Sequence, residues 1–346
     1  MSHPMTSLGI ARRMRFAVGA CVTALALLGG AGPAKAQFGL EGPFVATLKD
    51  TSGNPQTQAG SHPDAFTTTF NLHEVPGPDP SGSGGLIPVP DEKIKDVIVE
   101  LPPGLAGSAN GAAVCSVEQF GNIEQCPAES VVGVAELNLG LFGAPNPMKF
   151  AVFNLEPGPN QAARFGWRVL IPPVNVVTTV RSESDYGLTS SIADTNQAAA
   201  LYGSVLTLWG VPADHNLTSD VGSPDFGMPG HGPRRWLLRM PTACNGDLTV
   251  KLKINSYEHP ADVKEYTATL PGPTGCDAVP FNPSISVEPT TRQADAPSGY
   301  DIHIKLPQSE DPAQLGTADL KDATVTLPEG VSISPSAANG LQACTD

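Results

Sequence analysis

The chain has 346 residues, with 36 Gly and 35 Pro, and its 34 acidic side chains outnumber the 20 basic ones. This length allows two or three domains and a sizeable core. The surplus of acid disfavours binding to nucleic acid or anionic lipid, because both depend on basic patches. We therefore expect no nucleic-acid partner, and the many turn-forming residues favour a chain rich in β-structure.

The N-terminus has the three parts of a secretory signal peptide. Arginines at positions 12, 13 and 15 precede an apolar stretch at 16–30, and Ala34-Lys35-Ala36 is a small-x-small cleavage site. Cleavage between Ala36 and Gln37 is therefore expected. The alternative is a membrane anchor, which is disfavoured because a span needs about 20 apolar residues and this stretch is shorter. After cleavage we expect a secreted or cell-surface protein with no stable membrane span.

Two details of this segment leave alternatives open. Arg12-Arg13 is compatible with twin-arginine export as well as with the general secretory route. Cys21 ends a sequence that resembles a lipid-attachment site, but it lies too early in the apolar stretch for that role. Removing residues 1–36 takes away four bases and no acid, so the net charge of −14 becomes −18. Such a charge favours solubility outside the cell.

Alternation of apolar and polar residues predicts β-strands along most of the mature chain. Pro/Gly-rich segments separate these strands, and residues 51–64 and 74–90 are expected to be loose because segments of that composition bury little apolar surface. Residues 212–235 are expected to form a long excursion. The predicted strands are 44–48, 65–72, 97–101, 131–135, 149–155, 163–171, 174–181, 188–194, 205–211, 248–254, 266–270, 300–306 and 322–327.

One stretch occurs twice. Residues 95–104 read Lys-Asp-Val-Ile-Val-Glu-Leu-Pro-Pro-Gly, and residues 321–330 read Lys-Asp-Ala-Thr-Val-Thr-Leu-Pro-Glu-Gly. Gln-Ala followed by a strand precedes each copy, and a cysteine follows each, at Cys115 and Cys344. The shared order of features predicts an array of like units. The second copy lacks a counterpart of Cys126, so we expect an incomplete module and a longer natural protein.

The predicted fold class is all-β, with antiparallel β-sandwich-like modules and long Pro/Gly-rich loops. We expect a signal peptide at 1–36 and a β-rich body at 37–283, whose first repeat core covers about 58–140. Residues 284–346 are expected to be the incomplete second β-module.

Five cysteines remain after cleavage, and in an oxidising compartment they favour disulfides. Local spacing favours the pairs Cys115–Cys126 and Cys244–Cys276, although four cysteines allow three pairings. Each bond would stabilise the fold by about 3 kcal/mol in the chain-entropy model. Cys344 remains unpaired. A zinc site is disfavoured because there is no Cys-x-x-Cys and no histidine at ligand spacing, so no metal is expected.

With these residues identified, the chain resembles a group of uncharacterised secreted repeat proteins of soil actinobacteria. The resemblance spans about 58–346 and implies a cell-surface or extracellular protein, but it implies no activity. It rests on the following motifs: residues 58–64, residues 95–104, Cys115 with Cys126-Pro127, Asp185-Tyr186-Gly187-Leu188, Trp209-Gly210 and Pro241-Thr242-x-Cys244.

Motifs of catalysis are missing from the sequence. There is no Gly-x-Ser-x-Gly elbow, His-Glu-x-x-His helix, phosphate loop or dinucleotide fingerprint, so no catalytic residue and no cofactor is predicted. His62-Pro63-Asp64 and Asp214-His215 place a base near a carboxylate, but neighbours on a strand point to opposite faces. Exposed loop histidines are the simpler interpretation of both pairs.

A weak ligand-binding candidate is Trp236 beside Arg234 and Arg235, because an exposed tryptophan at a long loop can stack on a sugar ring. The leading hypothesis is a non-enzymatic extracellular or cell-surface β-repeat protein of structural or adhesive type. The alternatives are a carbohydrate-binding module and a secreted hydrolase of unrecognised type. The partners expected are extracellular glycans or envelope components.

Overall fold

The computed structural model describes residues 38–79, 84–121, 126–140, 145–168, 173–215 and 232–332. The signal peptide predicted at 1–36, its cleavage point at Ala36 and Gln37, and Cys344 lie outside the described residues. The body is all-β and antiparallel, and its described residues include one short helix, α1 (Val117–Gly121), and the 3-10 turns η2 (Ala128–Ser130), η3 (Pro212–Asp214) and η4 (Cys276–Ala278).

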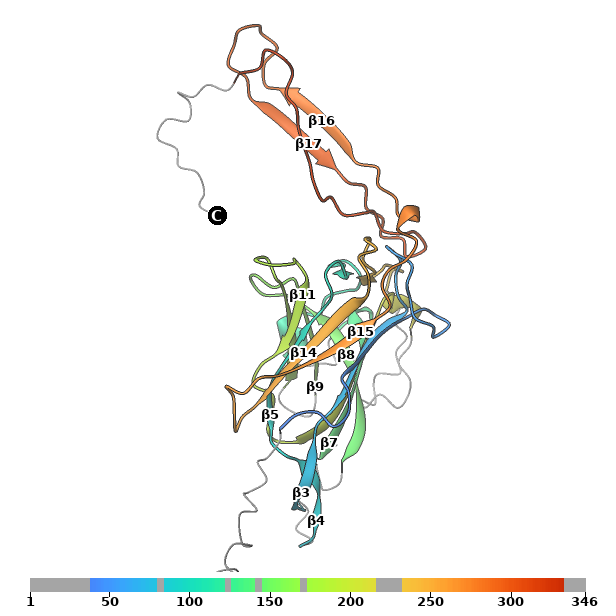
Figure 1. Cartoon of the computed structure of the whole chain (residues 1–346), viewed down its shortest axis with the longest axis vertical. Helices are drawn as coiled ribbons and strands as arrows, with labels where there is room; N and C mark the ends of the chain where they lie inside the picture. Colours follow the sequence, from blue (N-terminus) through green and yellow to red (C-terminus); the bar gives the residue numbers. More distant parts are fainter. Residues whose placement is uncertain are drawn as a thin grey trace, which may run out of the picture. The chain divides into compact units, whose positions relative to one another are not determined.

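A single eleven-stranded sheet forms the body, in the order β1-β2-β12-β7-β8-β9-β10-β11-β5-β14-β15 (Figure 1). Its strands are β1 (Val45–Lys49), β2 (Ala65–Asn71), β5 (Ile94–Glu100), β7 (Val131–Gly140), β8 (Asn146–Leu155), β9 (Ala163–Arg168), β10 (Pro173–Val180), β11 (Leu188–Ile192), β12 (Ala200–Trp209), β14 (Leu248–Ser256) and β15 (Lys264–Leu270).

The sheet curls until its two edges meet, which corrects the sandwich expected from the sequence. Edge strands β1 and β15 contact one another, and the backbone N–H of Leu40 donates to the Tyr266 hydroxyl at 3.0 Å. A bridge between Gln58 and Thr274 extends this seam beyond the strands. The product is a nearly closed, barrel-like sheet. Closure removes most of the free edge that an open sheet would present.

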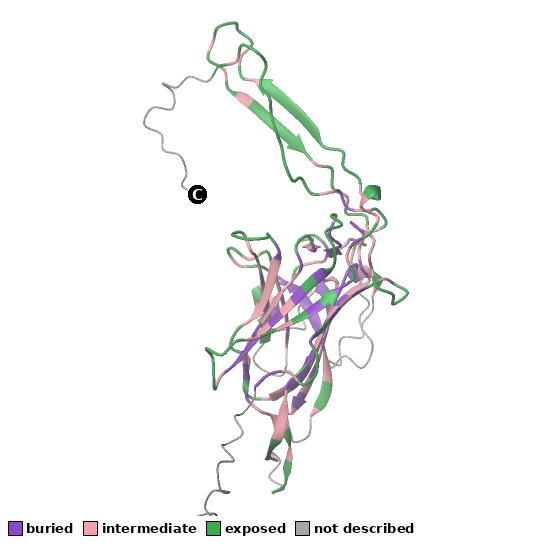
Figure 2. Ribbon diagram, viewed as in Figure 1, coloured by how far each residue is buried: buried purple, intermediate pink, exposed green. Residues whose placement is uncertain are grey.

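The predicted alternation holds in most strands, and it is clearest in β14. Leu248, Val250, Leu252 and Ile254 are buried, while Thr249 between them is exposed. Figure 2 shows buried residues concentrated on the strands of the barrel. Because side chains alternate with a period of two, one face of each strand lies inside the barrel and the other faces outward.

Three further expectations need correction. Residues 74–90 are not a loose loop: Glu74–Pro78 (β3) pairs with Leu86–Pro90 (β4), although 80–83 lie outside the described residues. Proline is tolerated in such a two-stranded edge. The Tyr202 hydroxyl donates to the Pro88 carbonyl at 3.2 Å, which ties the hairpin to β12. Residues 51–64 are also ordered, since the Asp50 carboxylate accepts the backbone N–H groups of Ser52 and Asn54.

The third correction concerns residues 322–327, which belong to no strand. A strand needs a neighbour to accept its backbone hydrogen bonds, and no described residue supplies one here. The remaining strands form two small sheets, Ala106–Gly107 (β6) with Leu238–Arg239 (β13), and Ser284–Pro289 (β16) with Tyr300–Lys305 (β17). Residues of β16 and β17 are mostly exposed (Figure 2).

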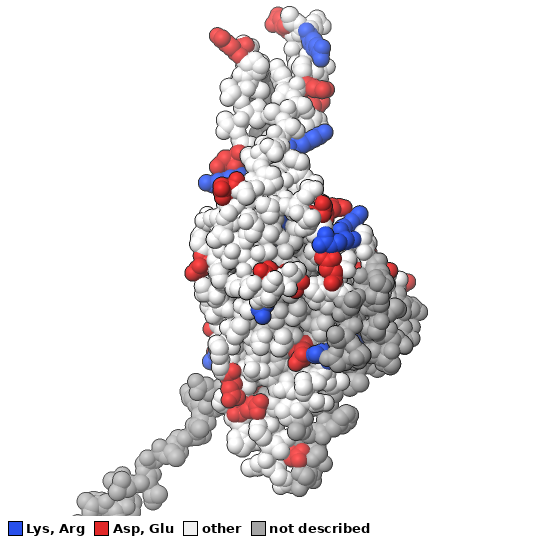
Figure 3. Space-filling view, turned by 90° about the vertical axis from the view of Figure 1, so that its right-hand side faces the viewer, with Lys and Arg blue, Asp and Glu red and all other residues white. Residues whose placement is uncertain are grey.

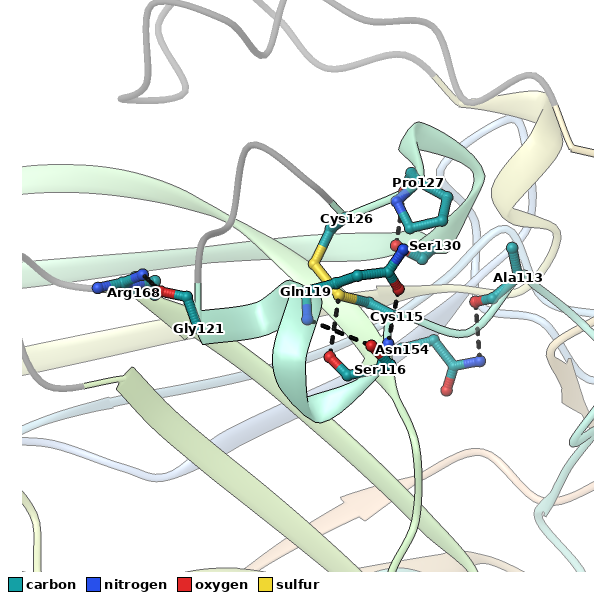
Figure 4. The surroundings of a disulfide bond; sticks show 10 residues. All are labelled: Ala113, Cys115, Ser116, Gln119, Gly121, Cys126, Pro127, Ser130, Asn154 and Arg168. Carbon is teal, nitrogen blue, oxygen red and sulfur yellow. Dashed lines mark hydrogen bonds between the residues drawn. A yellow bond between two sulfur atoms is a disulfide. The ribbon is translucent and has the colours of Figure 1, made fainter.

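Both predicted disulfides are present. Cys115–Cys126 spans 5.1 Å between Cα atoms and Cys244–Cys276 spans 6.0 Å. The first lies beside α1, whose start is a capping box (Figure 4). The Gln119 backbone N–H donates to the Ser116 hydroxyl, and the Gln119 side chain accepts the Ser116 N–H. This Ser-x-x-Gln signal was present in the sequence and marks a helix start.

Candidate functional site

The barrel interior contains a cavity of about 690 Å³. It lies among the inward-facing side chains of β2, β5, β7 to β12 and the segment 193–199. Most of the wall is aliphatic or aromatic. Its apolar members include Phe66, Phe70, Val97, Val99, Leu101, Leu137, Leu139, Val152, Phe165, Trp167, Val174, Val176, Ile192, Leu201, Leu206 and Leu208.

This space is far larger than an ordinary packing defect. Protein interiors hold few voids larger than a water molecule, which occupies about 30 Å³ in the liquid. Leu252 and Val250 on β14 are fully buried, whereas the inward-facing Leu206, Leu208 and Val99 on the cavity wall are only partly buried. The interior is therefore filled at β14 itself, while the cavity is lined by β12 and also by β5, whose Val99 lies opposite Leu252. Small-molecule sites commonly have volumes of about 300–1,000 Å³ with mainly apolar walls.

One end of the cavity has a polar rim. Lining residues there include Glu92, Lys93 and the segment 194–197. Hydrogen bonds hold this rim in place: the Tyr257 hydroxyl donates to the Thr195 carbonyl at 2.8 Å, and the Thr195 N–H donates to the Lys95 carbonyl at 2.8 Å. Since these bonds join β5, the residue that follows β14 and the segment 193–199, the rim has a fixed backbone.

The charged groups at the rim neutralise one another. Lys95 Nζ lies 2.9 Å from Asp194 and 3.0 Å from Asp96. The hydrogen bond to Asp194, followed by that to Asp96, raises the pKa of the Lys95 ammonium. An ion pair with this geometry holds Asp194 close to the start of β5. Charge at this rim is therefore largely satisfied by the protein itself.

Glu92 is a buried carboxylate held by two partners. The Ser256 hydroxyl donates to one of its oxygens, and His259 Nδ1 lies 2.9 Å from the other. The hydrogen bond to Glu92 raises the pKa of His259. In a hydrolase triad the histidine stands between serine and carboxylate. Here the carboxylate stands between them and the serine is fully buried, so the cluster has the wrong order for nucleophilic catalysis.

Two hydroxyl-bearing side chains on adjacent strands, Thr68 on β2 and Ser204 on β12, interrupt the apolar wall. The register pairs Thr68 with Leu206 and Phe70 with Ser204, so the two residues are diagonal neighbours on the inner face. A third hydroxyl, Ser190 on β11, lies 2.9 Å from that of Thr178. Two further uncharged polar groups on strands line the cavity: the Asn175 amide, whose oxygen accepts from Arg164, and the Trp167 indole N–H, which is buried without a hydrogen-bond partner among the described residues.

The predicted ligand-binding residue Trp236 is half-buried near the junction with residues 307–319. Its ring stacks on His62 at 5.1 Å, and its indole N–H donates to the Ser309 carbonyl at 2.7 Å. Burial lowers the pKa of His62. Arg234 pairs with Asp214 at 2.7 Å and Arg235 with Glu310 at 3.2 Å. The platform role of this group stays a prediction.

The two histidine–carboxylate pairs considered in the sequence are linked to each other. His215 Nε2 lies 3.4 Å from Asp64 Oδ1, and the His215 ring stacks on Trp209 at 4.8 Å. Sequence reasoning missed both this link and the cavity, because each depends on which strands meet. Alternation showed which side chains point inward, but nothing local showed how far apart they would lie.

Within the described ranges no helix is long and apolar enough to cross a membrane. The same residues contain no cluster of three His, Cys, Asp or Glu side chains suited to hold a metal ion. Comparison of the chain with protein-family models, with curated proteins and with solved structures finds no match.

Proposed function

We propose that this chain is an exported, non-enzymatic β-protein whose barrel encloses an elongated apolar small molecule. The observation that carries the proposal is the cavity of about 690 Å³ with its apolar wall. Small antiparallel barrels hold a single ligand in this way, because the closed sheet keeps water away from an apolar guest. Binding would release the water that an unfilled apolar wall contacts, which is favourable.

Other features support the exported and non-enzymatic parts of the proposal. Two disulfides indicate an oxidising compartment. On the face shown in Figure 3, Lys and Arg side chains are scattered among Asp and Glu. This surface suits a soluble extracellular protein. At the rim, Lys95 engages Asp194, and Glu92 lies between Ser256 and His259, an order that does not suit nucleophilic catalysis.

Cavity filling tests the proposal. Titration of the mature protein with N-phenyl-1-naphthylamine, a neutral apolar dye, should give saturable fluorescence enhancement. Leu206→Trp places a larger ring in the cavity and should weaken dye binding by at least tenfold. Val205→Trp is the matched control, because its side chain faces outward on the same strand. Absence of saturable binding in the wild type, or equal loss in both variants, would contradict the proposal.

A structural or adhesive role is the second candidate, and the β16–β17 hairpin favours it. Ile285 pairs with Ile304, and Val287 with Ile302, so the four side chains share one face. Their exposed fractions range from 39% for Ile304 to 57% for Ile285. Exposed apolar faces of this kind often mark interaction sites. Sedimentation velocity of the wild type and of Ile285→Lys would show whether this face associates.

The carbohydrate-binding alternative remains tied to Trp236. A glycan array screened with the mature protein, followed by Trp236→Ala, tests it directly. Because Trp236 also contacts His62 and Ser309, thermal unfolding of the variant must accompany the binding assay. Specific glycan binding that disappears in a folded variant would establish the alternative, and binding that persists would exclude this residue as the platform.

A further inference from the structure

We propose that the ligand of the barrel is an uncharged single-chain lipid bearing a hydroxyl or ester oxygen, and that Thr68 and Ser204 bind this oxygen. The inference rests on the proposed function and adds the chemical class of the ligand. It starts from two hydroxyl-bearing side chains on adjacent strands of a mainly apolar wall, which also carries the Ser190 hydroxyl and the Trp167 indole N–H. In such sites a few placed polar groups fix the orientation of the guest.

The evidence for Thr68 is stronger than that for Ser204. Its residue is only 7% exposed, yet it lines the cavity, and its hydroxyl makes no hydrogen bond to any described residue. The neighbouring outward-facing threonine behaves differently, since the Thr67 hydroxyl lies 3.0 Å from that of Thr207. Buried hydroxyls generally find hydrogen-bond partners, because leaving one without a partner costs free energy.

Ser204 extends the same polar patch across the sheet. It lines the cavity one strand away from Thr68, and its side chain likewise bonds to no described residue. Directly opposed and diagonal positions on adjacent strands lie about 5–8 Å apart. One ligand oxygen placed between the two can therefore accept a hydrogen bond from one hydroxyl and, where it carries a proton, donate to the other.

The charge state of the ligand follows from the rim. Lys95 already pairs with Asp194, and His259 with Glu92, so those charges are satisfied within the protein. Lys93 is the one cation among the described lining residues, and its backbone N–H donates to the Glu258 carboxylate at 3.0 Å, which brings a negative charge close to it. Acids outnumber bases in the described lining at this end, with Glu92 and Asp194 against Lys93. A carboxylate is therefore disfavoured relative to an alcohol or ester.

The experiment compares 1-octanol with nonane, which have the same number of heavy atoms and differ by one oxygen. Displacement of bound N-phenyl-1-naphthylamine gives both affinities for the wild type. The wild-type ratio of these affinities includes the cost of removing the 1-octanol hydroxyl from water, so the informative quantity is the change in this ratio when the Thr68 hydroxyl is removed. Thr68→Val keeps the shape of the side chain and removes its hydroxyl, and should lower the affinity for 1-octanol by roughly 3–10-fold while leaving that for nonane unchanged.

Thr67→Val is the matched control, because it makes the same change on the outward face of the same strand. It should leave both affinities unchanged. Octanoate at pH 8 should bind at least tenfold more weakly than 1-octanol. If Thr68→Val leaves the affinity for 1-octanol unchanged, or weakens both compounds alike, the assignment of the oxygen to Thr68 is wrong while the apolar cavity site stands. If neither compound displaces the dye and the dye itself does not bind, the proposed function fails as well.

Discussion

Two leucines on the inner face of the barrel should differ in how much they stabilise it. Leu252 on β14 is fully buried, and Leu206 on β12 lines the cavity and is partly buried. We therefore compare Leu252→Ala with Leu206→Ala. The chemical change is identical, so any difference in the free energy of unfolding reports the environment.

The magnitudes follow from burial and from the space left behind. Removing about three buried methylene equivalents costs about 2.4 kcal/mol in transfer free energy, and a new cavity raises the loss to about 3–5 kcal/mol. Leu252→Ala should fall in this range. Leu206→Ala removes atoms that already face an open space, so it loses only part of the transfer term and creates no new enclosed void. We expect a loss of about 1–2 kcal/mol there.

Urea unfolding followed by circular dichroism measures both losses under oxidising conditions, with the slope m checked for constancy. The disulfides must stay intact, because their reduction would violate two-state behaviour. Equal losses of about 3–5 kcal/mol at both positions would refute the reasoning, since they would mean that Leu206 is packed as tightly as Leu252. That outcome would also remove the basis for a ligand in the barrel.

The remaining predictions concern charge and cross-links. The hydrogen bond to Glu92 raises the pKa of His259 in the folded protein. This interaction therefore stabilises the fold fully below about pH 6.5, and the stabilisation is lost as pH rises through the folded pKa. In His259→Gln, the corresponding fall of the urea midpoint between pH 6 and 8 should disappear. The Arg181 guanidinium lowers the pKa of Asp185 to about 2, so stability is lost between about pH 4 and 2. Because that carboxylate is 43% exposed, Asp185→Asn should cost only about 0.2–1 kcal/mol at pH 7. Replacing Cys115 and Cys126 together by serine should cost about 2–4 kcal/mol, and a change below 1 kcal/mol would show that the loop is held without the bond.

Local pattern was sufficient for most strands and for both disulfides. The segment from Leu248 to Ile254 predicts a half-buried strand, because apolar and polar residues alternate strictly along it. The pairing of Cys115 with Cys126 followed from proximity in the chain, since a separation of 11 residues closes easily. In both cases the information lies within a dozen residues. Side-chain alternation and the closure of a short loop are determined locally and require no contact with distant parts of the fold.

Local pattern failed where the outcome depended on a distant partner. Residues 74–90 have the composition of a flexible loop, yet Tyr202 from β12 contacts Pro88 and helps to hold the β3–β4 hairpin. Residues 322–327 have a strand pattern as good as that of β5, but they lack a neighbouring strand among the described residues. β5 itself lies between β11 and β14, which occur about ninety and one hundred and fifty residues later in the chain. Alternation therefore predicts which face of a strand is buried, whereas the identity of the neighbouring strand depends on the topology of the whole sheet.

The same distinction explains why the candidate site was invisible in the sequence. The diameter of a barrel grows with the number of its strands, and about eight strands already leave an interior that side chains just fill or that holds one small ligand. This sheet has eleven strands. On the β14 and β15 side, Leu252 and Leu270 are buried in the interior, whereas on the β12 side Leu206 and Leu208 line the cavity and are only partly buried. A cavity is thus a consequence of strand number and closure together, and its chemistry is then set by the few inward positions that are not apolar, Thr68 and Ser204 foremost.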